Sequence, residues 1–323
     1  MKKNILLSII TPTLNNHKDL RNFLTSIKKQ NFPKSQLEVI IVDGGSTDDT
    51  LLIAKEFGVK ILHNKDKFAD AGVNLGMKHA VGEIYMVLAA DNIYKSSNAL
   101  QKIVDVFKDP NIVGAFPRHA YMKTDTIYTK YINTFTDPAN HFVYGYACNP
   151  RTFERVYTVL KKTQDYTVYD YTSSKIIPLI AFAQGFTVRS SFKRNKVNSF
   201  DDIAPVMEII KSRKKIAYMH SVDLYHHTVS GFYNFVNKQA WKTRNYLYKK
   251  NFGISHRIKL LSEQQTKRIY YWPYYSLTII PPFIFALYHL VKDREKMWIL
   301  HPFMCIISGY SSFFVYISYK IKK

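Results

Sequence analysis

Four short apolar runs near the N-terminus constrain the fold more than any other feature. They are Ile5–Ile10, Val39–Val42, Val59–Leu62 and Ile84–Ala89. Helical patterns of apolar residues separate them, and strands that alternate with helices predict parallel βαβ units. The sequence therefore predicts an α/β fold whose polar side chains collect at the carboxyl ends of parallel strands, where such sheets bind ligands.

Polar motifs follow three of these runs. The first run leads into Thr11-Pro12-Thr13, and the fourth leads to Asp91. The second ends at Asp43 and is followed by the Gly-rich turn 44–49, in which Ser46 or Thr47 is expected to cap the next helix. Carboxylates at neighbouring strand ends predict a polar binding crevice.

The combined motifs resemble a known family. The patterns IxxPTxN, VDGGSTDxT and AxxNxG with AxGE, followed by an acidic strand end, are similar to family 2 inverting glycosyltransferases of the GT-A fold. The resemblance implies a Rossmann-like mixed sheet with helices on both faces, a nucleotide-diphosphate sugar donor and transfer with inversion. One departure is that Ala89-Ala90-Asp91 stands where the family usually has Asp-x-Asp, so the first carboxylate is absent.

The resemblance also implies which residues bind the donor. They are Thr11, Pro12, Thr13, Asn15, Asp43, Gly45, Ser46, Asp70, Asn74, Asp91 and Arg244. A divalent metal, Mn²⁺ or Mg²⁺, is expected on Asp91, with His226 as a second protein ligand, because many GT-A enzymes supply a histidine from a strand end. The alternative for His226 is a structural role.

An acidic pair precedes a predicted helix over Val206–Lys211. Asp201 and Asp202 resemble the family's catalytic acidic pair, and Asp202 is expected to take the proton of the acceptor hydroxyl as the general base. The alternative is that this aspartate caps the helix. On a later basic helix, Lys242 or Arg244 is expected to neutralise the diphosphate.

The C-terminal part changes in composition. Residues 270–291 and 297–319 are two apolar segments of about membrane-spanning length, flanked by basic residues at both outer ends. We expect a catalytic domain at 1–266, with a nucleotide-sugar part (1–95) and an acceptor part (96–266), and a membrane-associated helical hairpin at 267–323. Because Pro281-Pro282 must break or kink the first segment, a re-entrant or interfacial hairpin and a buried helix pair remain alternatives.

Composition bounds the partners. The net charge of +22 allows nucleic-acid binding, but the Lys and Arg residues are dispersed and no nucleic-acid-binding motif is present, so we expect no nucleic-acid partner. We expect the basic surface to bind membrane lipid instead. Two distant cysteines, Cys148 and Cys305, predict a reducing compartment, and a short N-terminal apolar run does not fit a signal peptide.

These features predict a glycosyltransferase on the cytoplasmic face of the cell membrane. Its acceptor is expected to be a lipid-linked or cell-surface glycan, as in envelope polysaccharide biosynthesis. The alternatives are a sugar nucleotidyltransferase, which would need a glycine-containing phosphate loop after the first strand, and a catalytically degenerate GT-A binding module, suggested by Ala89.

An apolar pattern over Thr152–Leu160 predicts a further helix.

Overall fold

The computed structural model describes residues 5–192, 202–248 and 257–321. The chain forms two compact units, and each is described by itself. The first unit comprises Met1–Ala120, Tyr157–Ser173 and Ile180–His226, and the second comprises Tyr121–Val156, Ser174–Leu179 and His227–Lys323.

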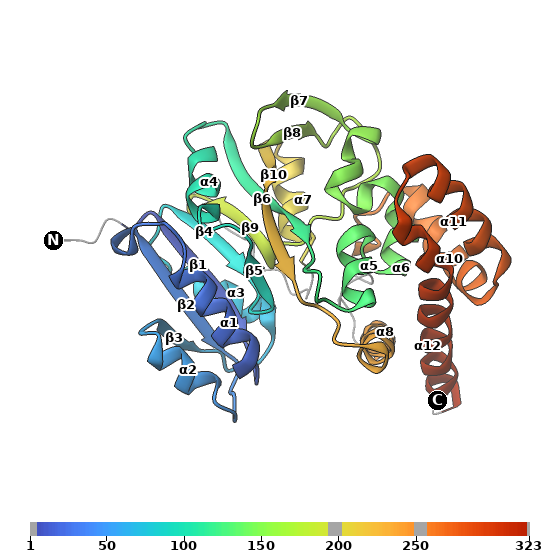
Figure 1. Cartoon of the computed structure of the whole chain (residues 1–323), viewed down its shortest axis with the longest axis horizontal. Helices are drawn as coiled ribbons and strands as arrows, with labels where there is room; N and C mark the ends of the chain where they lie inside the picture. The colour runs from blue at the N-terminus through green and yellow to red at the C-terminus, as the bar shows by residue number, and fades with distance from the viewer. Residues whose placement is uncertain (1–4, 193–201, 249–256, 322–323) are drawn as a thin grey trace. The chain divides into compact units, whose positions relative to one another are not determined.

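A mixed sheet forms the centre of the first unit (Figure 1). Its order is β3-β2-β1-β4-β9-β6-β10-β8-β7, and β5 pairs with β10 outside this path. The strands are β1 (Leu7–Thr13), β2 (Leu37–Asp43), β3 (Lys60–His63), β4 (Ile84–Leu88), β5 (Asn92–Tyr94), β6 (Ile112–Ala120), β7 (Thr158–Lys162), β8 (Thr167–Asp170), β9 (Gln184–Arg189) and β10 (Lys215–His226).

The predicted βαβ series is confirmed by the strand pairing. β1 runs parallel to both β2 and β4, and β2 runs parallel to β3. The register of β1 with β2 places Thr13 opposite Asp43, so the two polar strand ends are neighbours. β9 is antiparallel to β4 and β6, which makes the sheet mixed.

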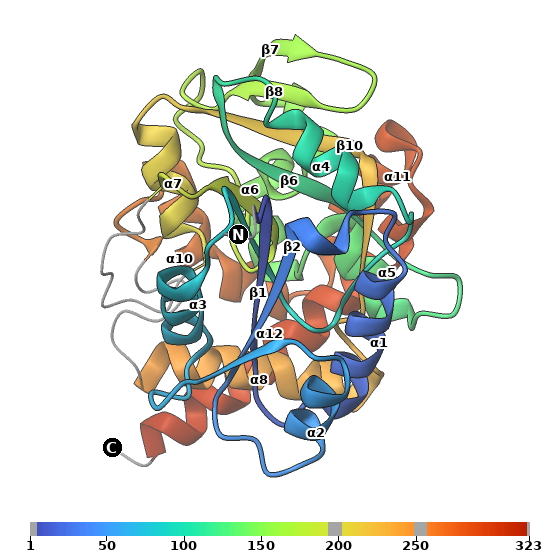
Figure 2. The same ribbon diagram turned by 90° about the vertical axis from the view of Figure 1, so that its left-hand side faces the viewer.

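Helices cover both faces of this sheet (Figure 2). They are α1 (His17–Lys28), α2 (Thr50–Glu56), α3 (Ala69–His79), α4 (Ala99–Val106) and α7 (Ala204–Lys211). The apolar stripe of α1, which includes Leu20 and Phe23, packs in one hydrophobic cluster with Leu7 and Ile9 of β1. Alternation along the strand sends Ile10 to the other face, where it clusters with Leu75 of α3.

Two glycines let α3 approach the sheet closely. A Cβ on Gly76 would lie 2.3 Å from Cγ2 of Ile10, and one on Gly72 would lie 3.1 Å from Cβ of Pro12. Real side chains do not tolerate the first distance, so a glycine is needed where α3 crosses β1. The AxxNxG motif therefore has a packing role, which also fixes α3 next to the end of β1.

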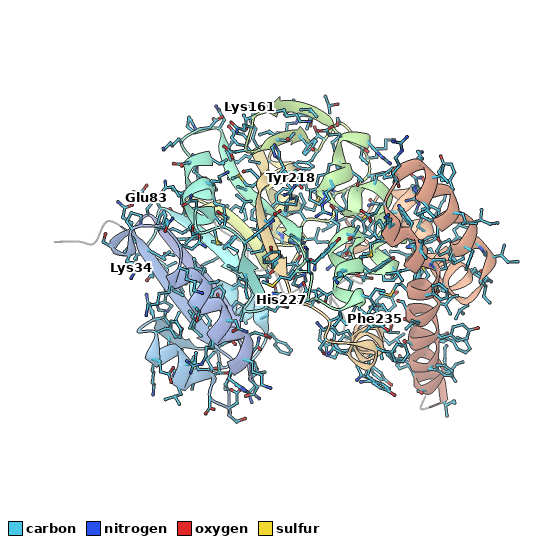
Figure 3. The ribbon with its side chains drawn as sticks, in the orientation of Figure 1. Lys34, Glu83, Lys161, Tyr218, His227 and Phe235 are labelled. Carbon is cyan, nitrogen blue, oxygen red and sulfur yellow. The ribbon has the colours of Figure 1, made fainter. Side chains whose placement is uncertain are left out.

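The second unit is helical. Its elements are α5 (Ile127–Phe135), α6 (Pro138–Tyr144), α8 (Phe232–Tyr248), α10 (Glu263–Leu277), α11 (Ile280–Asp293), α12 (His301–Ile321) and the 3₁₀ turns η2 (Gly145–Cys148), η3 (Pro150–Arg155) and η4 (Lys296–Leu300). A buried cluster joins Tyr131 and Phe135 of α5, Phe235 of α8 and Trp298 of η4. Phe235 on α8 lies in this core (Figure 3).

The first C-terminal apolar segment is broken. α10 and α11 meet at an angle of 101°. α11 begins at Ile280 with prolines in its first turn, as expected for the Pro281-Pro282 pair, which cannot continue a preceding helix. Among the described residues, Lys296–Ile321 is long and apolar enough to cross a membrane, which is weak evidence for membrane association.

Some local expectations differ from the structure. α2 begins at Thr50, so neither Ser46 nor Thr47 is its cap. The helix expected over Thr152–Leu160 was wrong: the 3₁₀ turn η3 ends at Arg155 and is followed by the exposed edge strand β7, which pairs with β8. The boundary expected at residue 266 lies within α10, and the division of labour between 1–266 and 267–323 stays a prediction.

Candidate active site

Hydrogen bonds join the loops after β1 and β2. The backbone N–H of Asn15 donates to Oγ of Ser46 at 2.8 Å, and the N–H of Thr47 donates to Oδ1 of Asn15 at 2.8 Å. Asn15 adopts a φ of 49°, a left-handed conformation that asparagine tolerates better than most residues. The Asn of the PTxN motif therefore holds one strand-end loop against the next.

Asp43 organises the Gly-rich turn that follows it. Its side chain is buried, and its carboxylate accepts from the N–H of Gly45 at 2.9 Å and from the N–H and Oγ of Ser46 at 3.1 and 2.6 Å. These contacts satisfy a buried charge with its own loop. Gly45 has a φ of 94°, which explains a glycine at this step of the turn.

Asp48 links the same turn to α1. Its carboxylate accepts from the N–H of Thr50 at 3.0 Å and lies 2.8 Å from Nδ1 of His17. Hydrogen bonds from Thr50 and His17 hold the pKa of Asp48 well below its usual range. This carboxylate therefore stays ionised and belongs to the loop framework.

The remaining predicted donor residues lie along β1 and α3. Thr11 and Thr13 are buried, and among the described residues their hydroxyls have no hydrogen-bond partner. Asp70 and Asn74 are half-buried and one turn apart on α3, so they share a face of that helix. Gly72, between them in sequence, packs against Pro12.

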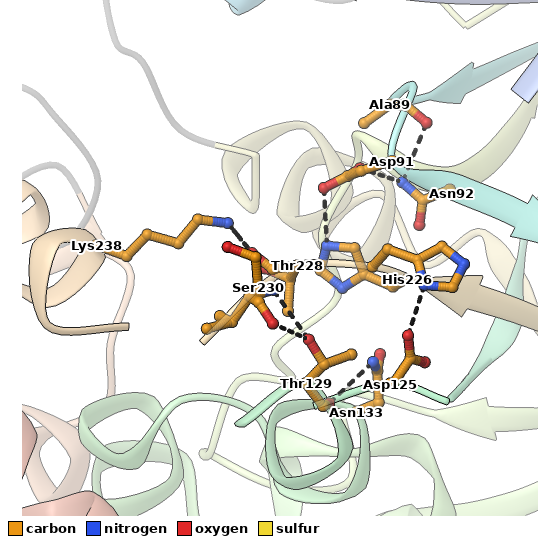
Figure 4. A network of polar contacts seen from close by, with 12 residues as sticks. Ala89, Asp91, Asn92, Asp125, Thr129, Asn133, His226, Thr228, Ser230 and Lys238 are labelled. Carbon is orange, nitrogen blue, oxygen red and sulfur yellow. Dashed lines mark hydrogen bonds and ion pairs between the residues drawn. The ribbon is translucent and has the colours of Figure 1, made fainter. Parts of the chain in front are cut away.

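Asp91 and His226 are brought together by a short strand. β5 starts at Asn92 and pairs with the end of β10, with Asn92 opposite His226. Oδ2 of Asp91 consequently lies 3.5 Å from Nε2 of His226 (Figure 4). Nδ2 of Asn92 donates to Oδ1 of Asp91 at 3.0 Å and orients the carboxylate.

Asn92 was not among the residues singled out from sequence. Its Oδ1 is buried and has no partner within the described part of the chain. The available signal was an asparagine directly after the aspartate of a strand end. His119 is a second residue near this pair that the sequence analysis did not single out, and its ring lies 5.8 Å from that of His226.

A loop before β9 joins the segments that carry Asp91 and Asp202. The N–H of Phe182 donates to the carbonyl of Asp202 at 2.9 Å, and the carbonyl of Ala183 accepts from the N–H of Ala89 at 3.0 Å. α7 begins after Ile203 at its N-cap, without a side-chain cap, so Asp202 is not the capping residue. Asp201 lies outside the described residues.

The pair formed by Asp91 and His226 has the chemistry of a partial metal site. In the ranges that the structure describes, no three His, Cys, Asp or Glu residues gather as a metal-binding group. A carboxylate and an imidazole can nevertheless share one cation when other ligands come from substrate phosphates or water. The separation of 3.5 Å fits, because two atoms that ligate one cation at about 2.1 Å lie at most about 4.2 Å apart.

The predicted cations Lys242 and Arg244 belong to α8 in the second unit. Nζ of Lys242 lies 3.3 Å from Oδ2 of Asp137, and Arg244 is exposed. In the same unit, Nδ1 of His227 lies 2.7 Å from Oδ1 of Asp125. Adjacent histidines at the end of β10 are thus each beside an aspartate of their own unit.

Known proteins resemble this chain in sequence. One is poly(ribitol-phosphate) beta-N-acetylglucosaminyltransferase TarS of Staphylococcus aureus, 34% identical over 91 residues, which are 26% of this chain and 16% of TarS. Another is glucosyl-3-phosphoglycerate synthase of Petrotoga mobilis, 28% identical over 122 residues, which are 37% of this chain and 34% of the relative. The matches thus span about a sixth and a third of these relatives' lengths.

Solved structures resemble it over nearly its whole length. The mannosyltransferase PcManGT from Pyrobaculum calidifontis, solved with GDP-Man and Mn²⁺, has a TM-score of 0.55 at 12% identity and covers 95% of this chain and 86% of its own. Residues 1–349 of S. aureus TarS give 0.52 at 15% identity, with 99% and 92% covered. These likenesses confirm the predicted GT-A fold. The sequence pattern of Glycosyl transferase family 2 matches residues 8–171, and the chain belongs to this family.

Proposed function

We propose that the protein transfers a single sugar, with inversion, from a nucleotide-diphosphate sugar to a lipid-linked or cell-surface glycan acceptor. The observation that carries this proposal is the pair of Asp91 and His226, 3.5 Å apart, on segments tied to that of Asp202. A cation held by such a pair would stabilise the charge that develops on a departing diphosphate, and a carboxylate is the usual proton acceptor for the attacking hydroxyl. The family's relatives, which include a beta-N-acetylglucosaminyltransferase, support the reaction class.

The donor would lie against the strand ends. The nucleoside is proposed to contact the Thr11–Thr13 edge, Asn15, Asp70 and Asn74, with the buried hydroxyls of Thr11 and Thr13 lining the crevice. Asp43 stays a predicted contact of the nucleoside, and its carboxylate also shapes the turn that carries Gly45 and Ser46. Arg244 stays a predicted contact of the diphosphate.

Asp91 and His226 would hold Mn²⁺ or Mg²⁺, whose charge favours departure of the diphosphate. Asn92 keeps the Asp91 carboxylate oriented. Asp202 would accept the proton of the acceptor hydroxyl while the hydroxyl oxygen bonds to the anomeric carbon. The bond from that carbon to the diphosphate breaks on the opposite face, and its electron pair leaves with the diphosphate. Asp201 stays a predicted partner of Asp202.

Attachment to the cytoplasmic face of the cell membrane is part of the proposal. It is supported by the apolar helix over Lys296–Ile321 and by the basic residues around the C-terminal segments. Such attachment would bring the transferase to an acceptor carried on a lipid.

Thermal unfolding with a panel of nucleotide-sugars, with and without Mn²⁺, tests the proposal. A ligand at about 100 times its Kd adds about 2.7 kcal/mol to stability, so one donor should raise Tm only when Mn²⁺ is present. Asp91→Ala should abolish this rise, while Asp105→Ala, at a half-buried position on α4 that pairs with Lys108, should keep it. If no nucleotide-sugar stabilises the protein, or Asp91→Ala responds like the parent, the donor site is misassigned.

A further inference from the structure

The exposed side of α11 is apolar, whereas the exposed side of a helix in a water-soluble unit is usually polar. The buried side of α11 carries Pro282, Ala286 and His289. Its exposed side is a continuous apolar stripe at helical spacing, which we call the α11 stripe. The stripe consists of Ile280, Phe283, Ile284, Leu287, Tyr288 and Val291, whose exposed fractions run from 43% to 79%.

Neither α11 nor the α10–α11 pair can cross a bilayer as one straight helix. α11 has 14 residues, which at about 1.5 Å each give about 21 Å, shorter than a hydrocarbon core of about 30 Å. The pair is bent by 101°. An apolar stripe on one face of a short helix is the pattern of helices that lie along the membrane surface.

α12 is long enough to span, but another helix runs along it. Oγ of Ser308 donates to Oε1 of Gln239 at 3.2 Å, and Oγ1 of Thr243 donates to Oγ of Ser312 at 2.8 Å. Further on, the rings of Tyr248 and Tyr319 lie 4.8 Å apart. α8 therefore accompanies the C-terminal half of α12.

This pairing opposes a transmembrane position for α12. α8 carries Lys238, Lys242 and Arg244, and a spanning α12 would draw these cations into the hydrocarbon, where charge is costly. The outer side of α12 is nevertheless apolar, with Phe303, Phe314 and other exposed side chains. If α12 contacts only the interfacial layer of a bilayer, its apolar outer side meets lipid and the cations of α8 stay out of the hydrocarbon.

Cations mark one end of the α11 stripe. Lys292, Arg294 and Lys296 follow it directly, and Nζ of Lys292 donates to the hydroxyl of Tyr288 at 2.9 Å. The two carboxylates between them have partners in the protein: Asp293 pairs with Arg155 and His289, and Glu295 accepts from the N–H of Met297. Lysine and tyrosine side chains in this arrangement suit the boundary between acyl chains and phosphate headgroups.

From these features we propose that the second unit binds the surface of an anionic bilayer through the α11 stripe, in plane and without crossing. The inference rests on the membrane attachment in the proposed function and specifies its mode. The α11 side chains enter the interfacial layer, and the cations after the stripe contact lipid phosphates.

The test adds purified full-length protein to preformed vesicles of phosphatidylcholine, alone or mixed with phosphatidylglycerol, and measures co-sedimentation. We expect binding to the mixed vesicles, weaker binding to pure phosphatidylcholine, and release by alkaline carbonate. Leu287→Glu should weaken binding by about tenfold or more, since a carboxylate enters the interface. Leu52→Glu is the matched control, because Leu52 on α2 is 56% exposed against 55% for Leu287.

Several outcomes would overturn the proposal. They are no vesicle binding, equal binding by Leu287→Glu and Leu52→Glu, or retention after carbonate. A protein that self-associates without vesicles and is dispersed by Leu287→Glu would mean that a second copy covers the stripe. Val291→Glu replaces Leu287→Glu if the latter fails to fold. Nucleotide-sugar stabilisation of the same variants is read separately, so failure of the donor site is distinguished from failure of the membrane contact.

Discussion

The two units place their polar groups in opposite ways. In the first, a hydrophobic core that includes Leu7, Ile9 and Met86 is buried, and charged side chains gather at the strand ends. In the second, three histidines surround the buried Trp298, while apolar side chains lie on the outside of α11 and α12. The rings of His141, His289 and His301 lie 5.1, 4.6 and 5.1 Å from that of Trp298.

The histidine core is held by specific partners. Nδ1 of His301 lies 2.6 Å from the hydroxyl of Tyr131, and Nδ1 of His289 lies 2.7 Å from Oδ2 of Asp293. Buried polar groups with partners can join helices whose outer faces are apolar. The comparison shows that the apolar side chains of residues 270–319 lie on the outer surface of the second unit as well as in its core.

The largest expected effect concerns Asp202, the proposed general base of the first unit. Asp202→Asn should lower the transfer rate by about 10²–10⁴-fold, because it removes the proton acceptor and keeps the side-chain shape. Donor affinity should not change, and Asp105→Asn should transfer like the parent. Steady-state and single-turnover kinetics check this. Near-parental transfer by Asp202→Asn would assign the base to another group.

Close packing in the first unit gives the next effect. Gly76→Ala should lower the free energy of unfolding by about 1–3 kcal/mol, because the added Cβ would lie 2.3 Å from Cγ2 of Ile10. Gly231→Ala in the second unit is the control, since no atom lies within 4 Å of its added Cβ. Denaturant titration measures both, and equal stabilities would show that α3 can move away from β1.

The histidine core of the second unit should respond to pH. Burial, aided by the nearby His289 and Arg268 and opposed by Asp293 and Asp137, lowers the pKa of His141 from 6.5 to about 3. Between these values the unfolded chain binds a proton that the folded unit does not. The contribution of His141 to the free energy of unfolding is therefore fully present above about pH 6.5. Below that pH, the free energy of unfolding falls by about 1.4 kcal/mol per pH unit.

His141→Phe sharpens this prediction. Among the described residues, Nδ1 of His141 has no hydrogen-bond partner, so an aromatic ring of similar size should be tolerated. The variant should unfold with a weaker dependence on pH than the parent, measured by denaturant titration from pH 7 to 5. An unchanged pH dependence would mean that His141 titrates normally in the folded protein.

The smallest expected effect is at the junction of the β1 and β2 loops. Asn15→Ala should cost about 1 kcal/mol, because the N–H of Thr47 loses its acceptor and alanine is disfavoured at a φ of 49°. Asn15→Asp keeps an acceptor oxygen and should lose less. Denaturant titration compares the two, and equal losses would leave no role for the side-chain contact.

Sequence patterns predicted the first unit better than the second. The strands β1, β2 and β4 were recognisable as apolar runs separated by helical patterns, and the family resemblance placed Asp91 and His226 together. β5 was missed because its three residues, Asn92–Tyr94, show no period and pair with a strand far along the chain. The Thr152–Leu160 expectation failed because a short edge strand follows a 3₁₀ turn there.

The second unit was harder to predict for a physical reason. Hydropathy along the chain does not say which face of an apolar helix meets protein and which meets its surroundings. The α11 stripe and the buried His289 occur on the same helix, and only the packed structure separates them. Segment 270–291 therefore reads as one apolar stretch although it forms parts of two helices.

The hydrogen bonds around Asn15 and Asp43 have a consequence for the entropy of donor binding. Asn15, Ser46, Thr47 and the Asp43 carboxylate bond to one another, so the two loops are ordered by contacts within the protein. A loop that is already fixed loses little conformational freedom when a ligand arrives. Donor association at this edge should therefore resemble the docking of a nucleotide onto a rigid surface, with discrimination among donors set by fit more than by loop closure.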